Sequence, residues 1–112
     1  MSIQKWSERI WVVRLNDDPA FTEDLDHLAD QVLAPDRMPH LVLDFSSVVH
    51  LCSSNLSALL RLRKALLDRK SQLRLTAPGD AVWAVFLTTG LDKVFQFSHD
   101  TTTALAELQI GS

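Results

Sequence analysis

Apolar positions in the first third of the chain change from strand-like to helical spacing. Residues 10–15 form a β-rich run that stops at residues 16–19, and a short strand over residues 2–6 could precede it. After Thr22, the expected N-cap, apolar side chains return at helical spacing until residues 34–36, where a proline ends the helix. This pattern predicts a strand followed by a helix, with an early hairpin as an optional antiparallel edge.

The rest of the chain alternates between short apolar runs and amphipathic stretches. The expected elements are a strand over 40–45 buried on both faces, a helix over 56–69, a strand over 72–76, a helix over 81–88, a strand over 94–97 and a final helix. The expected boundary residues are Ser53, Ser54 and Asn55 before the helix over 56–69, Gly90 after the next helix, and Asp100 or Thr101 before the last. The expected inward face of the helix over 56–69 consists of Leu56, Leu59, Leu60, Leu66 and Leu67.

This order of elements predicts an α/β fold. Strands that alternate with helices form layered structures in which most neighbouring strands run parallel. We therefore expect one domain over residues 1–112, with a mixed, mostly parallel sheet of four to five strands and about four helices.

Composition narrows the class of protein. The chain has 112 residues, of which 46% are hydrophobic and 22% charged, as in an ordinary globular domain. Its net charge of -3 disfavours nucleic-acid binding through bulk positive charge. No apolar run is long enough to cross a bilayer or to form a signal peptide, and the lone cysteine, Cys52, suits a reducing compartment. We expect a cytoplasmic protein without a membrane span or a nucleic-acid partner.

Few residue patterns indicate chemistry. The four histidines are scattered, and the sequence lacks a phosphate-cradling glycine loop and a nucleophile elbow, so we expect no metal, no cofactor and no enzyme activity. A thiol enzyme built on Cys52 remains an alternative, with His50 as the candidate base. The start of the helix over 56–69 is the main candidate site, because serines there act either as caps or as phosphorylation sites whose charge the helix N-terminus stabilises.

Three stretches of the sequence resemble the anti-sigma-factor antagonist family, whose domains are called STAS domains. Residues 41–56 resemble the family's strand and loop, with Cys52-Ser53-Ser54-Asn55-Leu56 in the place of its Asp-Ser-Ser/Thr-Gly-Leu motif. Residues 73–75 resemble the next strand of the family, which a short helix follows. Residues 88–95 resemble the family segment that comes after that helix. Ala104-Leu105 lies in the closing helix. The resemblance spans nearly the whole chain and implies the STAS fold.

The resemblance also implies a function. In such proteins an anti-sigma factor, a serine kinase of the histidine-kinase-like ATPase type, phosphorylates the first serine of the motif, and a phosphatase reverses this. The unphosphorylated antagonist binds the anti-sigma factor and frees the sigma factor, which regulates transcription. Ser53 matches the phosphorylated position, and Ser54 is the fallback. The implied partner-binding residues are Ser53, Ser54, Asn55, Ser57, Arg61 and Lys64.

Two departures from the family motif keep an alternative open. Cys52 replaces its aspartate, and Asn55 replaces its glycine, which puts a side chain where a partner could otherwise approach closely. These departures favour a STAS module that is not phosphorylated and serves as a subunit of a transporter or a signalling scaffold.

Charge is distributed unevenly around the candidate site. The helix over 56–69 carries Arg61 and Lys64 on one face with Ser57, whereas residues 16–30 carry acidic side chains and no Lys or Arg. This charge distribution has two explanations of equal weight. The charged residues form two solvated helix faces, or they form a partner surface of complementary potential. Among the tryptophans, Trp6 is the best candidate for an exposed interface anchor.

Overall fold

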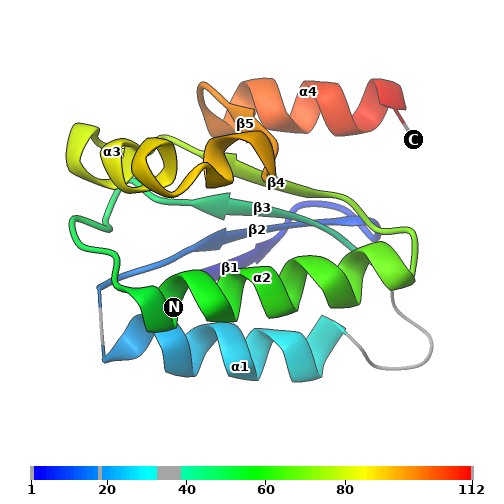
Figure 1. The fold of residues 1–112 in the computed structure, drawn as a ribbon. Coiled ribbons are helices and arrows are strands. Elements are labelled where there is room, and N and C mark those ends of the chain that lie inside the picture. Colours follow the sequence, from blue (N-terminus) through cyan, green and yellow to red (C-terminus); the bar gives the residue numbers. More distant parts are fainter. Residues whose placement is uncertain (1, 18, 33–38, 112) are drawn as a thin grey trace.

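The computed structural model describes residues 2–17, 19–32 and 39–111 of the chain (Figure 1). The strands are β1 (Ser2–Lys5), β2 (Ile10–Arg14), β3 (His40–Asp44), β4 (Leu73–Thr76) and β5 (Phe97–Ser98). The helices are α1 (Ala20–Val32), α2 (Ser53–Asp68), α3 (Asp80–Thr89), the short 3₁₀ helix η1 (Leu91–Lys93) and α4 (Thr101–Gly111). None of the helices in these ranges is long and apolar enough to cross a membrane.

The five strands form one sheet in the order β1-β2-β3-β4-β5. β1 pairs antiparallel with β2, which confirms the optional hairpin, and all later pairs are parallel. The prediction of a mixed, mostly parallel sheet is therefore confirmed. Because parallel strands share their direction, β2 to β5 end at one edge of the sheet, and the helices that follow begin at that carboxyl edge.

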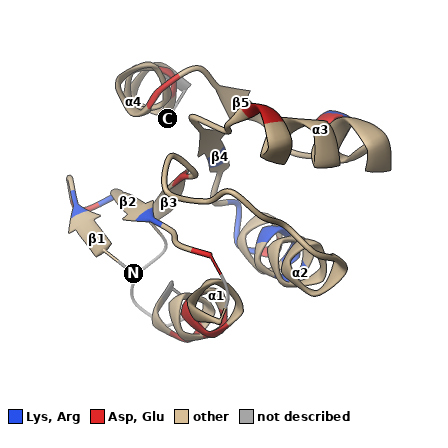
Figure 2. Ribbon diagram, turned by 90° about the vertical axis from the view of Figure 1, so that its left-hand side faces the viewer, with Lys and Arg blue, Asp and Glu red and all other residues tan. Residues whose placement is uncertain are grey.

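Helices cover both faces of the sheet. In Figure 2, α1, α2 and α3 lie on one face, and α4 lies on the other. The larger core lies under α1, α2 and α3 and includes Phe21, Phe45 and Phe86, whose rings contact one another edge-on or tilted. A smaller core joins α4 to β2 and β3. β3 is buried on both faces, as its continuous apolar run predicts.

The last strand exists, but the bounds predicted for it, residues 94–97, are wrong, because β5 covers only Phe97–Ser98. Gly90 adopts a left-handed backbone with a φ of 76° at the end of α3, and the chain then turns tightly through η1. The N–H of Val94 donates to the carbonyl of Leu91 at 3.0 Å, and Phe95 packs into the larger core. The apolar residues at 91, 94 and 95 have helical spacing, and this outweighs their β propensity.

Two further predictions need correction on the helices. Leu60 and Leu67 lie 37% and 51% exposed, so they belong to the outer face of α2 and not to its inward face. Each follows a buried residue by one position, a rotation of about 100° around the helix. Thr22 lies inside α1 and is not its cap, because α1 begins at Ala20. The predicted stop at residues 34–36 lies outside the described residues.

The start of the last helix follows the prediction. Asp100 accepts a hydrogen bond from the backbone N–H of Thr103 at 2.8 Å, which caps α4. This bond lowers the pKa of the Asp100 carboxyl from its ordinary value. The Asp100 alternative for the cap is therefore confirmed.

Candidate functional site

The candidate site lies at the carboxyl edge, where the loop after β3 leads into α2. At the end of β3, Asp44 accepts a hydrogen bond from the N–H of Ser46 at 2.8 Å, and Arg14 reaches its other carboxylate oxygen at 3.4 Å. These contacts fix the direction in which the chain leaves the sheet. The loop over residues 46–52 then crosses the carboxyl edge to the first turn of α2.

Asp17 anchors the middle of this loop. Its Oδ1 accepts hydrogen bonds from the backbone N–H groups of Val49 and His50 at 2.9 and 3.0 Å. Asp17 follows β2, more than thirty positions earlier in the chain, so this contact ties two loops of the same edge together. The loop is therefore held by charge-assisted hydrogen bonds, which are stronger than neutral ones.

Asn55 stabilises the first turn of α2 through hydrogen bonds of its side chain. Its Oδ1 accepts hydrogen bonds from the backbone N–H of Cys52 at 2.9 Å and from the Cys52 thiol at 3.3 Å. Its Nδ2 donates to the hydroxyl of Thr22 in α1 at 3.0 Å. Cys52 is the N-cap residue, and its pairing with Asn55 forms a capping box.

The burial of Asn55 corrects one expectation about the partner surface. Its side chain is 2% exposed, so it does not stand in the path of a partner as a surface group. Any contribution of Asn55 to docking is indirect, through the position of the loop and of α1. Its polar atoms are satisfied inside the fold, as buried polar groups require.

Ser53 and Ser54 lie exposed as the first two residues of α2. The backbone N–H groups of a first helical turn have no partner within the helix, and they carry the positive end of the helix dipole. Val49, which is 57% exposed, adds an apolar side chain on the adjoining loop. The first turn thus presents two hydroxyls beside an apolar contact, in a place that tolerates added negative charge.

The outer face of α2 extends the surface away from these serines. Ser57, Arg61 and Lys64 are all exposed, and they lie at helical spacing on this face as the sequence predicts. Leu60 lies among them, although the sequence placed it in the core. We call this set the α2 face: Ser53, Ser54, Ser57, Leu60, Arg61 and Lys64.

The acidic and basic segments lie side by side in the fold. Figure 2 shows acidic residues on α1 next to basic residues on α2. Arg61 approaches Asp26 of α1 at 4.0 Å, and both side chains are about two-thirds exposed, at 65% and 66%. An exposed pair at this distance contributes little to stability, which leaves the guanidinium of Arg61 available to a partner.

The remaining candidate residues have other places. The Cys52 thiol takes part in the cap through Asn55, and among the described residues no cluster of His, Cys, Asp and Glu could hold a metal ion. Trp6 is 40% exposed, but it lies in the connection between β1 and β2, away from the serines. It borders a hollow with Arg9 and Gln109. The structure therefore brings together Ser53, Ser54, Ser57, Arg61 and Lys64 on one face and leaves Trp6 apart from them.

Sequence reasoning missed the residues that support the site. Asp17 and Thr22 hold the loop and the cap through contacts with residues more than thirty positions away. Asp17 carries a turn-like signal in the sequence, but nothing there identifies Val49 and His50 as the groups it binds. Leu60 was expected on the inward face of its helix, and the sequence did not single out Val49, because the exposure of both depends on which way the loop and the helix face.

A protein-family model matches most of the chain. The model described as the Mlab, STAS domain matches residues 13–98 of the chain. No curated protein is similar enough in sequence to match.

Solved structures share the fold. A variant of RsbS from Moorella thermoacetica has 19% identity and a TM-score of 0.81, over 96% of this chain and 93% of its own. The anti-sigma factor antagonist SpoIIAA in its unphosphorylated form has 16% identity and a TM-score of 0.80, over 96% of this chain and 95% of its own. The STAS domain of the SulP transporter from Vibrio cholerae has 14% identity and a TM-score of 0.76, over 92% and 85%.

Proposed function

The chain belongs to the STAS domain family, and we propose that it is a regulatory protein-binding domain that binds an anti-sigma factor. The partner is a serine kinase of the histidine-kinase-like ATPase type, and phosphorylation of Ser53 switches the binding. The observation that carries this proposal is the pair of exposed serines that opens α2 on a loop held by Asp17 and Asn55.

A phosphate at Ser53 changes the surface without unfolding it. The group adds about -1.5 to -2 charges near neutral pH, and a helix N-terminus stabilises them. Arg61 lies eight positions further along α2, roughly 12 Å away at the rise of an α-helix, so it does not neutralise the phosphate. Phosphorylation therefore turns a neutral first turn into an anionic one that a partner fitted to the neutral surface rejects.

The α2 face supplies the rest of the docking surface. Val49 and Leu60 are exposed apolar side chains that a partner can bury. Arg61 and Lys64 provide positive potential, which governs the rate of encounter and the choice of partner more than the affinity. In this scheme the partner supplies ATP and the kinase activity, this chain is its substrate in the cytoplasm, and a phosphatase restores the free serine.

The test is phosphosite mapping on protein purified from its native cell, together with identification of the proteins that co-purify. We expect phosphate on Ser53, with Ser54 as the fallback position, and a kinase of the stated type among the bound proteins. Ser53→Ala should abolish the modification. Thr102→Ala removes an exposed hydroxyl from the first turn of α4 and should leave the modification unchanged.

Two outcomes of this mapping count against the proposal. One is a chain that carries no phosphate while it is bound to an active kinase of this type. The other is phosphate that persists when both Ser53 and Ser54 are replaced by alanine.

A second candidate function rests on Cys52 and Asn55. They replace the aspartate and glycine of the antagonist motif, and their mutual hydrogen bonds give them a structural role in the cap. A cap of this kind suits a STAS module that acts without phosphorylation, as a subunit of a transporter or a signalling scaffold. That module would use the same α2 face, but its partner affinity would not depend on charge at Ser53.

A further inference from the structure

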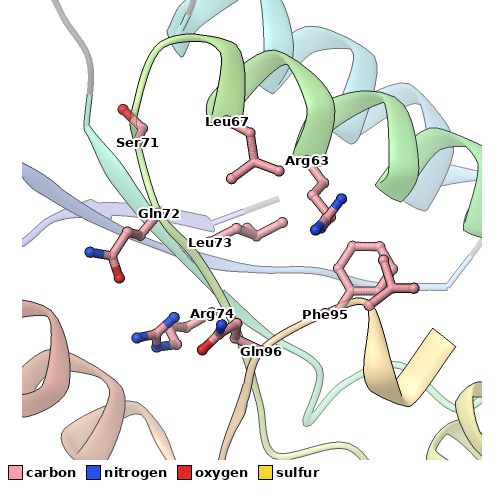
Figure 3. Close-up of a pocket in the computed structure, with 9 residues that line it drawn as sticks. Arg63, Leu67, Ser71, Gln72, Leu73, Arg74, Phe95 and Gln96 are labelled. Carbon is pink, nitrogen blue, oxygen red and sulfur yellow. The ribbon is translucent and has the colours of Figure 1, made fainter.

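A second polar hollow lies where β4 begins, at the amino edge of the sheet and away from the serines (Figure 3). Its volume is about 190 Å³. It lies between the second half of α2, the start of β4 and the segment before β5. Arg63 follows Ser53 by ten positions on α2, which puts it roughly 15 Å along the helix. None of the residues of the α2 face is among those that line the hollow, so the two are separate although Arg63 and Lys64 are neighbours in the sequence.

Two arginines border this hollow. Arg63 comes from α2 and Arg74 from β4, and Figure 3 shows them on opposite sides of Leu73. Neither residue belongs to the ion pairs found in the described part of the chain, and no described Asp or Glu lines the hollow. The hollow thus has two guanidinium groups and no carboxylate of its own.

Arg74 carries a polar group that the fold leaves unsatisfied. Its Nε is buried and has no hydrogen-bond partner among the described residues. A buried donor without a partner is uncommon in folded proteins, because it has lost its water without gaining another acceptor. An acceptor oxygen in the hollow reaches this Nε only when the Arg74 side chain shifts, because the atom exposes less than 1 Å² of surface.

The backbone of β4 adds further donors on the same side. The N–H of Leu75 donates to the carbonyl of Gln96 at 2.9 Å, but β5 pairs with β4 only at Leu75 and Thr76. Leu73 lies two positions before Leu75, so its backbone groups point to the same side of β4, beyond the reach of β5. Gln72 and Gln96 contribute amide side chains to the wall.

Apolar residues complete the wall. Leu67, Val94 and Phe95 also line the hollow, and the Leu73 side chain lies between the two arginines. A bare inorganic ion would leave this apolar surface uncovered, whereas a short carbon chain would bury it. A guanidinium fork matches the planar geometry of a carboxylate.

His40 lies in the same positively charged neighbourhood as Arg74. Its Nδ1 accepts a hydrogen bond from the backbone N–H of Gln72 at 2.9 Å. Burial lowers the pKa of His40, and the charges of Arg9 and Arg74 lower it further. The neighbourhood of Arg74 therefore disfavours additional positive charge and favours an anion.

We propose that this hollow binds a small aliphatic dicarboxylate, with one carboxylate on Arg74 and the other on Arg63. The carbon chain lies across Leu73 between them. The site does not depend on the proposed phosphorylation of Ser53.

The experiment is an NMR titration of the whole chain with glutarate at constant ionic strength. We expect saturable shifts at the Nε–H of Arg74 and at the amide of Leu73. Arg74→Gln and Arg63→Gln should each weaken binding about tenfold or more, because each removes a charged hydrogen-bond donor. Lys93→Gln removes an exposed charge next to the hollow without altering its lining, and it should leave the affinity unchanged.

Three comparisons make the outcome decisive. Butyrate, with one carboxylate, should bind more weakly than glutarate, and inorganic phosphate weaker still. Arg74→Lys keeps the charge and preserves the fold but lacks the guanidinium fork, so it should also bind more weakly than the wild type. The proposal is overturned if glutarate gives no saturation, if phosphate binds as tightly, or if Lys93→Gln weakens binding as much as Arg74→Gln.

Discussion

Asn55 illustrates how one residue can preserve a site while departing from a family motif. Where antagonists of this family have a glycine, Asn55 satisfies the N–H of Cys52 and the hydroxyl of Thr22, and it is 2% exposed. The sequence identified a good capping residue there, but it could not indicate that the side chain points inward, because that depends on Thr22 in another helix. The serines at 53 and 54 keep their exposed positions as a result.

We predict that Asn55→Ala lowers the free energy of unfolding by about 1–3 kcal/mol, because it removes a helix cap and the hydrogen bonds of Asn55 with Cys52 and Thr22. Urea denaturation followed by circular dichroism measures this change. Ser54→Ala, on the exposed side of the same turn, should change stability by less than about 0.5 kcal/mol. Equal effects of the two substitutions would show that the cap does not hold the turn.

His40 makes stability depend on pH. Burial and the charges of Arg9 and Arg74 lower its pKa in the fold from the ordinary value of 6.5. Between the two pKa values the unfolded chain binds more protons than the folded one, so the contribution of His40 is complete above pH 6.5. This contribution is lost as the pH falls through the pKa of the folded state.

We therefore predict that His40 titrates below 6.5 in an NMR titration, and that Arg74→Gln raises its pKa part of the way back. In a urea series, His40→Gln should show a smaller loss of stability than the wild type between neutral and mildly acidic pH. A His40 that titrates at or above its ordinary value would contradict this explanation.

At the scale of elements, periodicity predicted where helices lie better than it predicted how they end and turn. The strands at 10–14 and 40–44 and the helix at 53–68 were predictable because their apolar patterns are long and regular. The segment from Leu91 to Phe97 was not, because its course follows from the left-handed Gly90 and from packing of Phe95. The faces of Leu60 and Leu67 were missed because a run of adjacent leucines does not define one inward direction.

Gly90 gives a test at this scale. Its φ of 76° is costly for other residues, and an added Cβ would meet no atom within 4 Å, so the expected cost is one of backbone conformation alone. We predict that Gly90→Ala destabilises the fold by about 1–2 kcal/mol. Gly79→Ser, at the N-cap of α3 with a φ of -70°, should instead stabilise it by roughly a few tenths of a kcal/mol. Thermal denaturation compares the two, and a neutral Gly90→Ala would rule out the proposed role of the turn.

The whole molecule divides its surface chemistry between the two edges of the sheet. Four helices begin at the carboxyl edge, where the serines, Asp17 and Asp44 lie. Arg9, Arg63 and Arg74 lie toward the amino edge, and α2 runs from one edge to the other. The sequence predicted the sheet and therefore the position of the carboxyl edge. The hollow at the amino edge arises because β5 is short, and the periodicity of the sequence did not reveal the length of β5.

The affinity of the co-purifying partner for Ser53→Asp, measured by calorimetry beside the wild type, tests the central claim most directly. A phosphorylation-switched docking surface predicts that the substitution weakens binding by about tenfold or more, which corresponds to ~1.4 kcal/mol. Thr102→Asp adds the same charge to the first turn of α4, and it should bind as the wild type does. Unchanged affinity of Ser53→Asp would contradict the switch and favour the transporter or scaffold module.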